Sequence, residues 1–190
     1  MELIFASHNE NKVREIRAVL PGSIRVLSLN DIGFHEEIAE TGSTLEENAR
    51  IKAETIFDQT GKNVFADDSG LFVEVLDGAP GVYSFRYAGT GNSRDNISKL
   101  LDNLKNHENR NASFQTVFCV IMDGKTTFLK GEVYGKIIEE EKGTEGFGYD
   151  PVFIPDGFHE TFAEMSSEAK NQISHRTKAV QKLINFIENL

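Results

Sequence analysis

Four short segments combine charged side chains with residues that favour turns or helix starts, and each could bind a charged ligand. The first runs from Ser7 to Lys12, between an expected strand and an expected helix. Such a junction directs backbone N–H groups and the positive end of the helix to one point. Lys12 and Arg14 lie in the first helical turns, where a cation is unfavourable unless an anion binds beside it. From these residues alone, the segment is either an anion site or an ordinary polar turn capped by Asn9. The segment lacks the glycines and the Lys-Ser/Thr ending of a P-loop.

The second segment is Asp67-Asp68-Ser69-Gly70, which follows a short apolar run. Acids at the end of a strand lie where α/β folds place their ligand crevices. Since successive side chains of a strand point to opposite faces, Asp67 and Asp68 are expected to have different roles. One would bind a metal such as Mg²⁺, which prefers a few carboxylates with waters and substrate phosphates, and the other would form hydrogen bonds. A solvated turn is the alternative, because these residue types favour turns.

The third segment, residues 143–151, places glycines around Phe147, Tyr149 and Asp150. The glycines would let a flat ring approach the backbone and stack, and Asp150 would accept hydrogen bonds from the edge of a base. The alternative is a glycine-rich loop whose aromatic rings fill the core.

The fourth segment contains Lys170 and the run Ser174-His175-Arg176. Ser174 is expected to cap the last helix, so His175 and Arg176 occupy its first turn and repeat the cationic helix start at Lys12. Two such starts in one acidic chain indicate a shared anionic or carbonyl-rich ligand. A solvated helix start is the alternative.

The composition restricts the possible partners. The chain has 190 residues and a net charge of −10, so we expect no nucleic-acid binding, and a small anion would need local cations or a metal. No apolar run approaches the ~20 residues that span a bilayer, and no secretory signal is expected. Cys119 lies in an apolar run and is expected to be a core residue. A single cysteine is consistent with a reducing cytoplasm.

Hydrophobic periodicity and turn signals predict an α/β fold around a mixed central sheet. The expected strands are residues 2–6, 24–28, 64–66, 71–76, 112–122 and 126–138, the last two joined by a hairpin at Asp123-Gly124. The expected helices are residues 12–20, 44–60 with a capping box at Ser43-Thr44 and a C-cap at Gly61, 94–105 capped by Ser93, and a closing helix with Val180, Leu183, Ile184 and Ile187 on one face. Residues 1–190 are expected to form one domain, within which no boundary is readable.

In these segments the sequence resembles the inosine triphosphate pyrophosphatase family, also called the XTP/dITP diphosphatases. The matching motifs occur in family order across nearly the whole chain: Ser7–Lys12, Glu40–Thr44 with Glu47-Asn48-Ala49 and Lys52-Ala53, Ala66–Leu71, Pro80–Ser84 with Arg86–Gly89, Gly146–Pro151 and Ser174–Arg176. Each motif alone is weak, but six in order are specific. Two residues depart from the commoner pattern: His8 stands in place of Gly, and Phe85 in place of Ala.

The resemblance implies an elongated, two-lobed fold with a nucleotide cleft between the lobes, usually as a homodimer. It also implies Mg²⁺-dependent hydrolysis of ITP, dITP and XTP to the monophosphate and pyrophosphate, which cleanses the nucleotide pool. On matching positions, it assigns phosphate binding to Ser7, His8, Asn9, Glu10, Asn11, Lys12, Lys52 and Ser69. It assigns Mg²⁺ to Glu40 and Asp68, with Asp68 also accepting the proton of the attacking water. It assigns the base to Phe147, Gly148, Tyr149 and Asp150, with Lys170, His175 and Arg176 completing the pocket.

The expected selectivity depends on the 6-position of the purine. A buried donor such as Arg176 would pair with the 6-oxo group of ITP or XTP and would lack a partner opposite the 6-amino group of ATP. GTP also has a 6-oxo group, so its rejection must involve the 2-position. The alternatives are a pyrophosphatase for other modified nucleotides and a nucleotide-binding protein without turnover.

Overall fold

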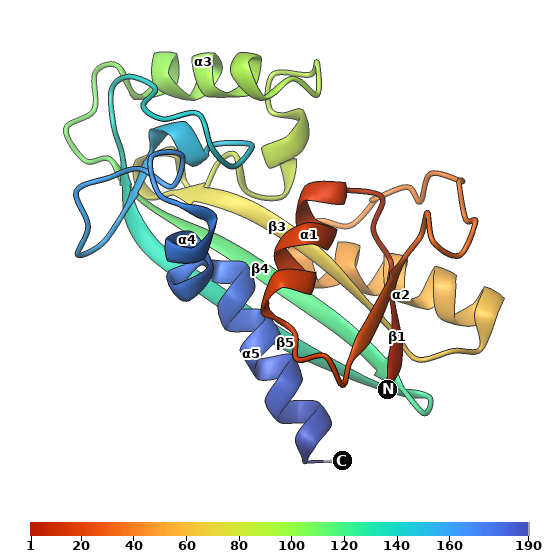
Figure 1. The fold of residues 1–190 in the computed structure, drawn as a ribbon. Helices are drawn as coiled ribbons and strands as arrows, with labels where there is room; N and C mark the ends of the chain where they lie inside the picture. Colours follow the sequence, from red (N-terminus) through yellow and green to blue (C-terminus); the bar gives the residue numbers. More distant parts are fainter. Residues whose placement is uncertain (190) are drawn as a thin grey trace. The chain divides into compact units, whose positions relative to one another are not determined.

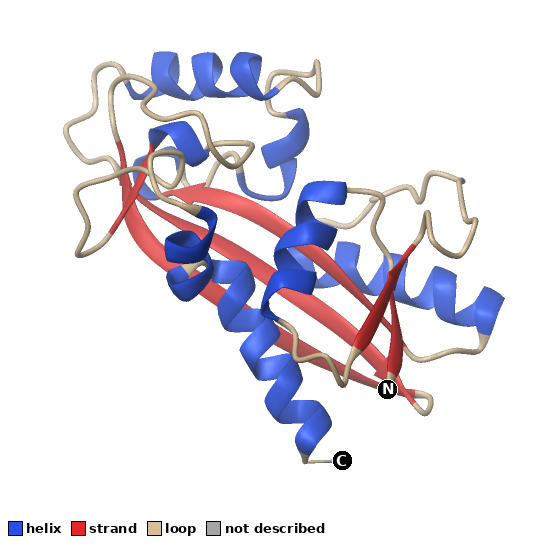
Figure 2. Ribbon diagram, in the orientation of Figure 1, coloured by secondary structure: helices blue, strands red, loops and turns tan. Residues whose placement is uncertain are grey.

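The computed structural model, which describes residues 1–189, has a six-stranded mixed sheet with helices packed against it (Figures 1 and 2). The strand order is β2-β1-β3-β4-β5-β6. Strand β1 runs parallel to β2 and β3, whereas β5 and β6 are antiparallel. The predicted α/β class with a mixed central sheet is therefore confirmed. Within residues 1–189, no helix is both long enough and apolar enough to cross a membrane.

The strands are β1 (Glu2–Phe5), β2 (Arg25–Ser28), β3 (Val64–Val73), β4 (Asn111–Met122), β5 (Lys125–Ile137) and β6 (Phe153–Pro155). The α-helices are α1 (Glu10–Val19), α2 (Leu45–Thr60), α3 (Ser93–Leu104), α4 (Ser167–Ile173) and α5 (His175–Glu188). The described residues also form the short 3₁₀ helices η1 (Glu74–Leu76), η2 (Gly81–Arg86) and η3 (Asp150–Val152).

Local capping determines where several helices begin and end. The side chain of Thr44 accepts a hydrogen bond from the Glu47 N–H at the start of α2, and Gly61 adopts the left-handed conformation at its end (φ 62°), as predicted. The predicted cap of α3 was wrong by one residue, because Asn92 rather than Ser93 accepts the first N–H bonds. Asp123 and Gly124 both have positive φ, which is typical of the predicted two-residue hairpin turn.

The chain divides into two compact units, each described separately below. Unit 1 contains Met1–Asp68, Thr116–Gly131 and the chain from Arg176 onward. Unit 2 contains Ser69–Gln115 and Glu132–His175. Strands β3, β4 and β5 each contribute residues to both units. A single family domain over residues 1–190 stays a prediction.

Two apolar layers of unit 1 cover opposite faces of its strands. Leu3 and Phe5 of β1 pack with residues of α1 and α5, whereas Ile4 and Ala6 pack with residues of α2. Figure 1 shows α1 and α5 in front of these strands and α2 behind them. The predicted apolar face of the last helix is confirmed, because Val180, Leu183 and Ile184 are buried and Ile187 packs against them. Cys119 is also fully buried, as expected.

Strand β3 is one continuous strand where the sequence predicts two, residues 64–66 and 71–76. Residues 64–73 form one continuous strand, and residues 74–76, predicted as strand, form η1. Asp67 and Asp68 therefore lie within a strand rather than at its end, and the predicted placement at a strand terminus was wrong. Polar residues do not interrupt the strand because both carboxylates have partners on the adjacent helices.

Unit 2 is organised around a separate apolar core. It is formed by the N-terminal part of β4, the end of β5, strand β6 and helix α3, with Phe114, Phe153 and Phe162 in mutual ring contact. Strand β6 and helix α4 have no counterpart among the predicted elements. Both are short, at 3 and 7 residues, and so carry little periodic signal.

Candidate active site

The segment from Ser7 to Lys12 forms the junction between β1 and α1 in unit 1. The side chain of Asn9 caps α1 by accepting hydrogen bonds from the N–H groups of Asn11 and Lys12. The hydroxyl of Ser7 accepts from the Asn9 N–H at 3.2 Å. The predicted asparagine cap is thus present, and the Lys12 side chain extends from the first turn of the helix toward β3.

His8 and Glu10 extend from this segment toward the chain that follows β2. The His8 Nε2 lies 3.0 Å from the Glu36 carbonyl oxygen, and its ring stacks on Phe34 with centroids 6.1 Å apart. Glu10 accepts a hydrogen bond from the Asn30 amide. The side chain of His8 therefore ties the segment to residues 30–36, a connection that a glycine at this position would lack.

The two acids of β3 point to opposite faces of unit 1, as the strand alternation predicts. Phe65, two residues before Asp67, belongs to the apolar layer of α1 and α5. Ala66, two residues before Asp68, belongs to the layer of α2. Asp67 accordingly contacts side chains from α1 and α5, and Asp68 contacts a side chain from α2.

Asp68 lies beside a polar group on α2 and the loop before it. The Asn48 amide donates to Asp68 Oδ2 at 2.9 Å, and the Asn48 Oδ1 accepts from the Gly42 N–H at 2.8 Å. One helical turn later, the Lys52 ammonium pairs with the Glu40 carboxylate. Asn48 therefore connects the second acid of β3 to the loop that carries Glu40.

The electrostatics around Asp68 favour a captured proton or a bound cation. Burial raises the pKa of Asp68, and the nearby Glu40 carboxylate raises it further, while Lys52 and Lys12 only partly oppose this. Burial alone would lower the pKa of Lys52, but the carboxylates of Asp67, Glu40 and Asp68 raise it above its ordinary value. Lys52 is therefore a permanent cation among several carboxylates, and the cations near Asp68 do not fully offset its burial.

Asp67 has the opposite surroundings. Its carboxylate is fully buried, lies 2.8 Å from the Lys12 ammonium and 3.8 Å from an Arg176 nitrogen. Burial alone would raise the pKa of Asp67, but Lys12, Arg176 and Lys52 together hold it well below its ordinary range. Arg176 also pairs with Glu15 of α1. Two carboxylates thus hold one buried guanidinium at the start of α5.

The donor set around Asp68 fits a divalent cation. Glu40 and Asp68 provide carboxylate oxygens, and Mg²⁺ prefers a small number of carboxylates together with waters and substrate phosphates. The raised pKa of Asp68, caused by burial and by Glu40, is the electrostatic condition that a nearby cation would relieve. Among residues 1–189, no group of three or more His, Cys, Asp and Glu side chains is arranged to hold a metal by itself.

In unit 2, the loop around Phe147 is fixed by a buried ion pair. Asp150 Oδ2 accepts hydrogen bonds from the Phe147 N–H at 2.8 Å and from the Lys170 ammonium at 2.7 Å. Both charged side chains are nearly completely buried. The Lys170 ammonium also lies 5.1 Å from the centre of the Phe147 ring, a cation–π contact. The structure thus unites three of the predicted base-site residues.

A glycine and a tyrosine shape the same loop. A side chain at Gly146 would place its Cβ 2.1 Å from Asp150 Oδ2, and the positive φ of 74° also favours glycine there. Tyr149 is buried in the core of unit 2, and its hydroxyl donates to the Ser84 carbonyl oxygen at 2.8 Å. Tyr149 therefore anchors the loop, which is the core-filling alternative considered for this segment.

The remaining predicted residues of unit 2 lie on different elements. The His175 ring stacks on Phe114, with centroids 4.9 Å apart and planes 10° apart. Ser69 and Gly148 are half-buried. The predicted roles of these residues in substrate binding remain predictions.

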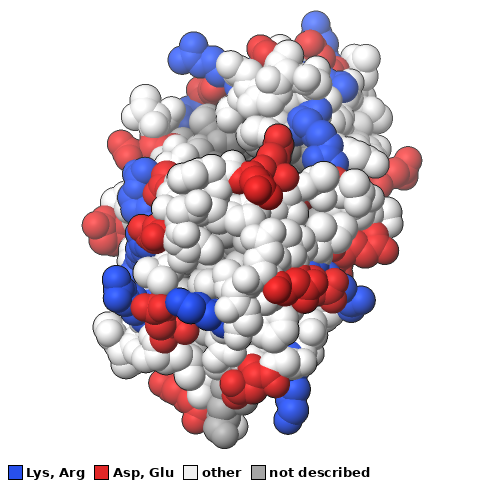
Figure 3. Space-filling view, turned by 90° about the vertical axis from the view of Figure 1, so that its right-hand side faces the viewer, with Lys and Arg blue, Asp and Glu red and all other residues white. Residues whose placement is uncertain are grey.

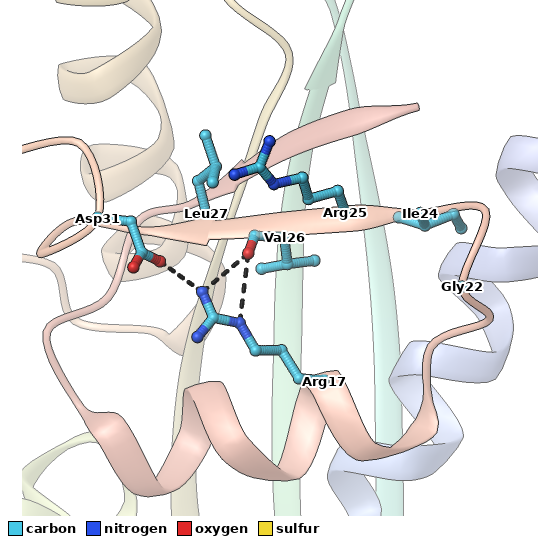
Figure 4. A pocket seen from close by; sticks show the side chains of 7 residues that line it. All are labelled: Arg17, Gly22, Ile24, Arg25, Val26, Leu27 and Asp31. Atoms are coloured by element: carbon cyan, nitrogen blue, oxygen red, sulfur yellow. Dashed lines mark hydrogen bonds and ion pairs between the residues drawn. The ribbon is translucent and has the colours of Figure 1, made fainter.

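Neither the face drawn in Figure 3 nor the hollow along β2 points to a further site. On the face in Figure 3, acidic and basic side chains are interspersed rather than gathered by sign. A shallow hollow of about 490 Å³ lies along β2. Beside it, Arg17 donates to the Val26 carbonyl oxygen at 2.8 Å and pairs with Asp31 (Figure 4). The hollow is lined by none of the predicted site residues.

Two residues with contacts in these clusters, Glu15 and Asn48, had no predicted role, and the partners of Asp67 were not predicted. Glu15 pairs with Arg176, Asn48 connects Asp68 to the Glu40 loop, and Asp67 joins two cations. The spacing of Asn48 and Lys52 was a usable signal, because residues four apart lie on one face of a helix. Glu15 and Arg176 are far apart in the sequence, so only the fold could reveal their contact.

Comparison with known proteins agrees with the sequence motifs. The model of the Ham1 family matches residues 3–186. The chain is 50% identical to the dITP/XTP pyrophosphatase of Flavobacterium psychrophilum over 190 residues, which is 100% of each chain. It is 52% identical to the protein of the same name from Bacillus licheniformis over 192 residues, covering 98% of each chain.

Solved structures show the same fold. The Ham1 protein of Staphylococcus aureus matches with a TM-score of 0.90 at 40% identity, over 100% of this chain and 99% of that one. A HAM1 protein from Coxiella burnetii matches with a TM-score of 0.91 at 36% identity over 100% of both chains. The resemblance read from the motifs is confirmed, and the chain belongs to the Ham1 family.

Proposed function

We propose that this chain is a pyrophosphatase that hydrolyses dITP, XTP and ITP to the monophosphate and pyrophosphate and so removes deaminated purine nucleotides from the nucleotide pool. The observation that carries the proposal is the buried Asp68 carboxyl, which Asn48 holds one helical turn from the pair of Lys52 and Glu40. An acid of this kind can accept a proton, and the adjacent ammonium can bind phosphate. Relatives named dITP/XTP pyrophosphatase, 50% and 52% identical over nearly the whole chain, support the substrate class.

The residues of unit 1 divide the phosphate chemistry between them in this proposal. Asp68 accepts the proton of the attacking water, a role worth typically 10²–10⁴-fold in rate. A raised pKa suits this role, because proton transfer is most effective when the pKa of the base approaches the working pH. Lys12, Lys52 and the polar groups of Ser7–Lys12 bind the phosphates and offset the charge that develops in the transition state.

Magnesium would be held by Glu40 and Asp68 in this scheme. When bound, it would supply Lewis-acid polarisation of the phosphoryl oxygens and partial neutralisation of the pyrophosphate. The net charge of −10 makes such local neutralisation necessary for a triphosphate ligand. Lys52, paired with Glu40, would then exchange part of its interaction with that carboxylate for phosphate oxygens.

The loop of unit 2 recognises the base in this proposal. The Phe147 ring stacks on the purine, and the buried pair of Asp150 and Lys170 fixes the loop and supplies polar groups to the base edge. His175 and Arg176 complete the recognition, with Arg176 donating to the 6-oxo group. A donor matched to an oxo group discriminates against an amino group, because the mismatch leaves polar groups without hydrogen bonds.

We further propose a homodimer in the cytoplasm that has no nucleic-acid ligand. Light scattering of the purified chain tests the dimer directly. A mass of one chain, about 21.2 kDa, would contradict it.

Product analysis tests the function itself. Purified protein is mixed with Mg²⁺ and with ITP, dITP, XTP, GTP or ATP, and the products are separated. Monophosphate and pyrophosphate from the first three, with little from GTP or ATP, is the expected result. Turnover of modified pyrimidine nucleotides instead would indicate another substrate class. Binding without turnover would indicate a nucleotide-binding protein, and diphosphate with phosphate would contradict the reaction.

A further inference from the structure

We propose that Asp67 is a positioning residue: its carboxylate fixes the Lys12 ammonium and the Arg176 guanidinium before the nucleotide binds. The inference rests on the proposed function, in which Lys12 binds phosphate and Arg176 reads the base. Asp67 itself contacts no substrate in this scheme. It acts through the two cations, and its contribution is to hold them in one geometry.

The contacts of Asp67 join three elements of unit 1. One oxygen, Oδ2, lies 2.8 Å from Lys12 Nζ of α1 and 3.8 Å from Arg176 Nη2 of α5, while Asp67 belongs to β3. The carboxylate is fully buried, and the Arg176 side chain is 3% exposed. One oxygen atom thus serves cations from two helices.

The partial exposure of Lys12 indicates that Asp67 does more than neutralise its charge. The Lys12 side chain is 15% exposed although its partner is fully buried, so the ammonium is held from the protein side while part of the lysine side chain faces solvent. A lysine chain has several rotatable bonds and is mobile unless its ammonium is fixed. The buried carboxylate therefore prepares Lys12 for an anion that arrives from solvent.

Charge balance explains why an acid is needed at this position. Lys12 and Arg176 repel each other when both approach the same point, and burial of unpaired cations is strongly unfavourable. The carboxylate of Asp67 offsets both, while Glu15 gives Arg176 a second partner. Lysine and arginine can thus be presented together without the cost of rearrangement at the moment of reaction.

A double-mutant cycle tests whether Asp67 acts through Lys12. Asp67→Asn keeps the shape of the side chain and removes the charge, and it is expected to lower kcat/KM for ITP by about 10²-fold, the effect of a misplacement of about 1 Å. In a Lys12→Ala background, the same substitution is expected to cause a clearly smaller loss than in the wild type, because one of the two cations that it positions is gone. Losses that multiply would overturn the proposal.

The matched control is Asp31→Asn in the same unit. Asp31 also pairs with an arginine, Arg17, but at the edge strand β2 and outside the candidate site. It is expected to leave kcat/KM within about 2-fold of the wild-type value, as surface substitutions usually have small effects. A loss as large as that of Asp67→Asn would show a general effect of breaking ion pairs and would contradict positioning.

Two further measurements cover the case in which Asp67→Asn does not fold. Asp67→Glu retains the charge and moves it by one methylene. It can replace Asp67→Asn in the double-mutant cycle with Lys12→Ala, with a smaller expected loss of kcat/KM for ITP. Without any change at Asp67, ¹⁵N NMR of the wild-type lysine ammonium groups, with Lys12 assigned by Lys12→Arg, is expected to show restricted motion of Lys12 in the nucleotide-free protein. Motion as free as that of the exposed Lys125 would overturn the proposal.

The outcomes separate this inference from the proposed function. A wild-type protein that does not hydrolyse ITP, dITP or XTP contradicts the function, while restricted Lys12 motion would still support its positioning by Asp67. If the wild-type protein is active but the losses of kcat/KM in the double-mutant cycle multiply, only the role of Asp67 is contradicted and the proposed function stands.

Discussion

Asp67 and Asp68 are neighbours in the chain, yet the two faces of β3 give them opposite electrostatic surroundings. Asp67 is balanced by Lys12 and Arg176, which hold its pKa far below the ordinary range despite burial. Asp68 is buried near Glu40, a second carboxylate, and its pKa is raised. The strand alternation separates the two groups, and the helices on each side determine which charge each acid meets.

The difference shows how one strand can provide both a fixed anion and a reactive one. An acid held ionised by two cations is a poor proton acceptor but a good structural anchor. An acid with a raised pKa binds a proton or a metal more readily. Neighbouring groups whose pKa values are pushed apart are a common arrangement in active sites.

The largest effect is expected for Asp68→Asn. If Asp68 accepts the proton of the attacking water, the substitution should reduce kcat for ITP by 10²–10⁴-fold while nucleotide binding persists, because an amide cannot accept that proton. Steady-state kinetics together with equilibrium binding of ITP checks this. Full activity in the variant would contradict the proposal that Asp68, unlike Asp67 on the other face of β3, takes part in the chemical step.

A smaller effect on selectivity is expected for Arg176→Ala, on the Asp67 side. Removing a buried donor to the 6-oxo group should reduce the preference for ITP over ATP by about 5- to 150-fold, which corresponds to ~1–3 kcal/mol for one hydrogen bond. The ratio of kcat/KM values for the two nucleotides is the measurement. An unchanged ratio would show that Arg176 does not read the base.

A still smaller effect on catalysis is expected for a substitution in the Phe147 loop of unit 2, outside β3. Gly146→Ala places a methyl group against Asp150 and requires an unfavourable φ, which costs ~1–3 kcal/mol. We expect KM for ITP to rise about 10-fold, with a smaller change in kcat, because the Phe147 loop shifts while unit 1 keeps its contacts. A loss confined to kcat would indicate that this loop takes part in the chemical step.

Much of the fold was predictable because the signals were local. The capping of α2, the Asp123-Gly124 turn and the apolar face of α5 depend on residues close together in the sequence, and all three were confirmed. The division of β3 into two strands was wrong because Asp-Asp-Ser-Gly also favours turns. The buried cations that allow the strand to continue come from distant elements.

The candidate site was predictable as a set of residues but not as a set of contacts. The opposite orientation of Asp67 and Asp68 followed from strand alternation alone. Which cations each acid meets depends on the packing of α1, α2 and α5, which no local pattern specifies. The pairing of Glu15 with Arg176 and the hydrogen bond from Tyr149 to Ser84 also join residues that are distant in the sequence, so no local pattern predicted them.

The most direct test of the comparison is the thermal stability of Asp67→Asn and Asp68→Asn as a function of pH, without metal and with EDTA. The lowered pKa of Asp67 stabilises the fold above the ordinary value of 3.8, and this stabilisation is lost as pH falls. The raised pKa of Asp68 has the opposite sign: stability is lost as pH rises above 3.8 and the buried carboxyl ionises.

At pH 7, Asp67→Asn should therefore lower the unfolding temperature, by an amount that reflects the ~3–5 kcal/mol cost of breaking a buried ion pair. Asp68→Asn should raise the unfolding temperature, and its gain should disappear as pH falls toward 3.8. Shifts of opposite sign at neutral pH are the predicted result. Shifts of the same sign would contradict the account that the two faces of β3 hold their acids in opposite electrostatic states.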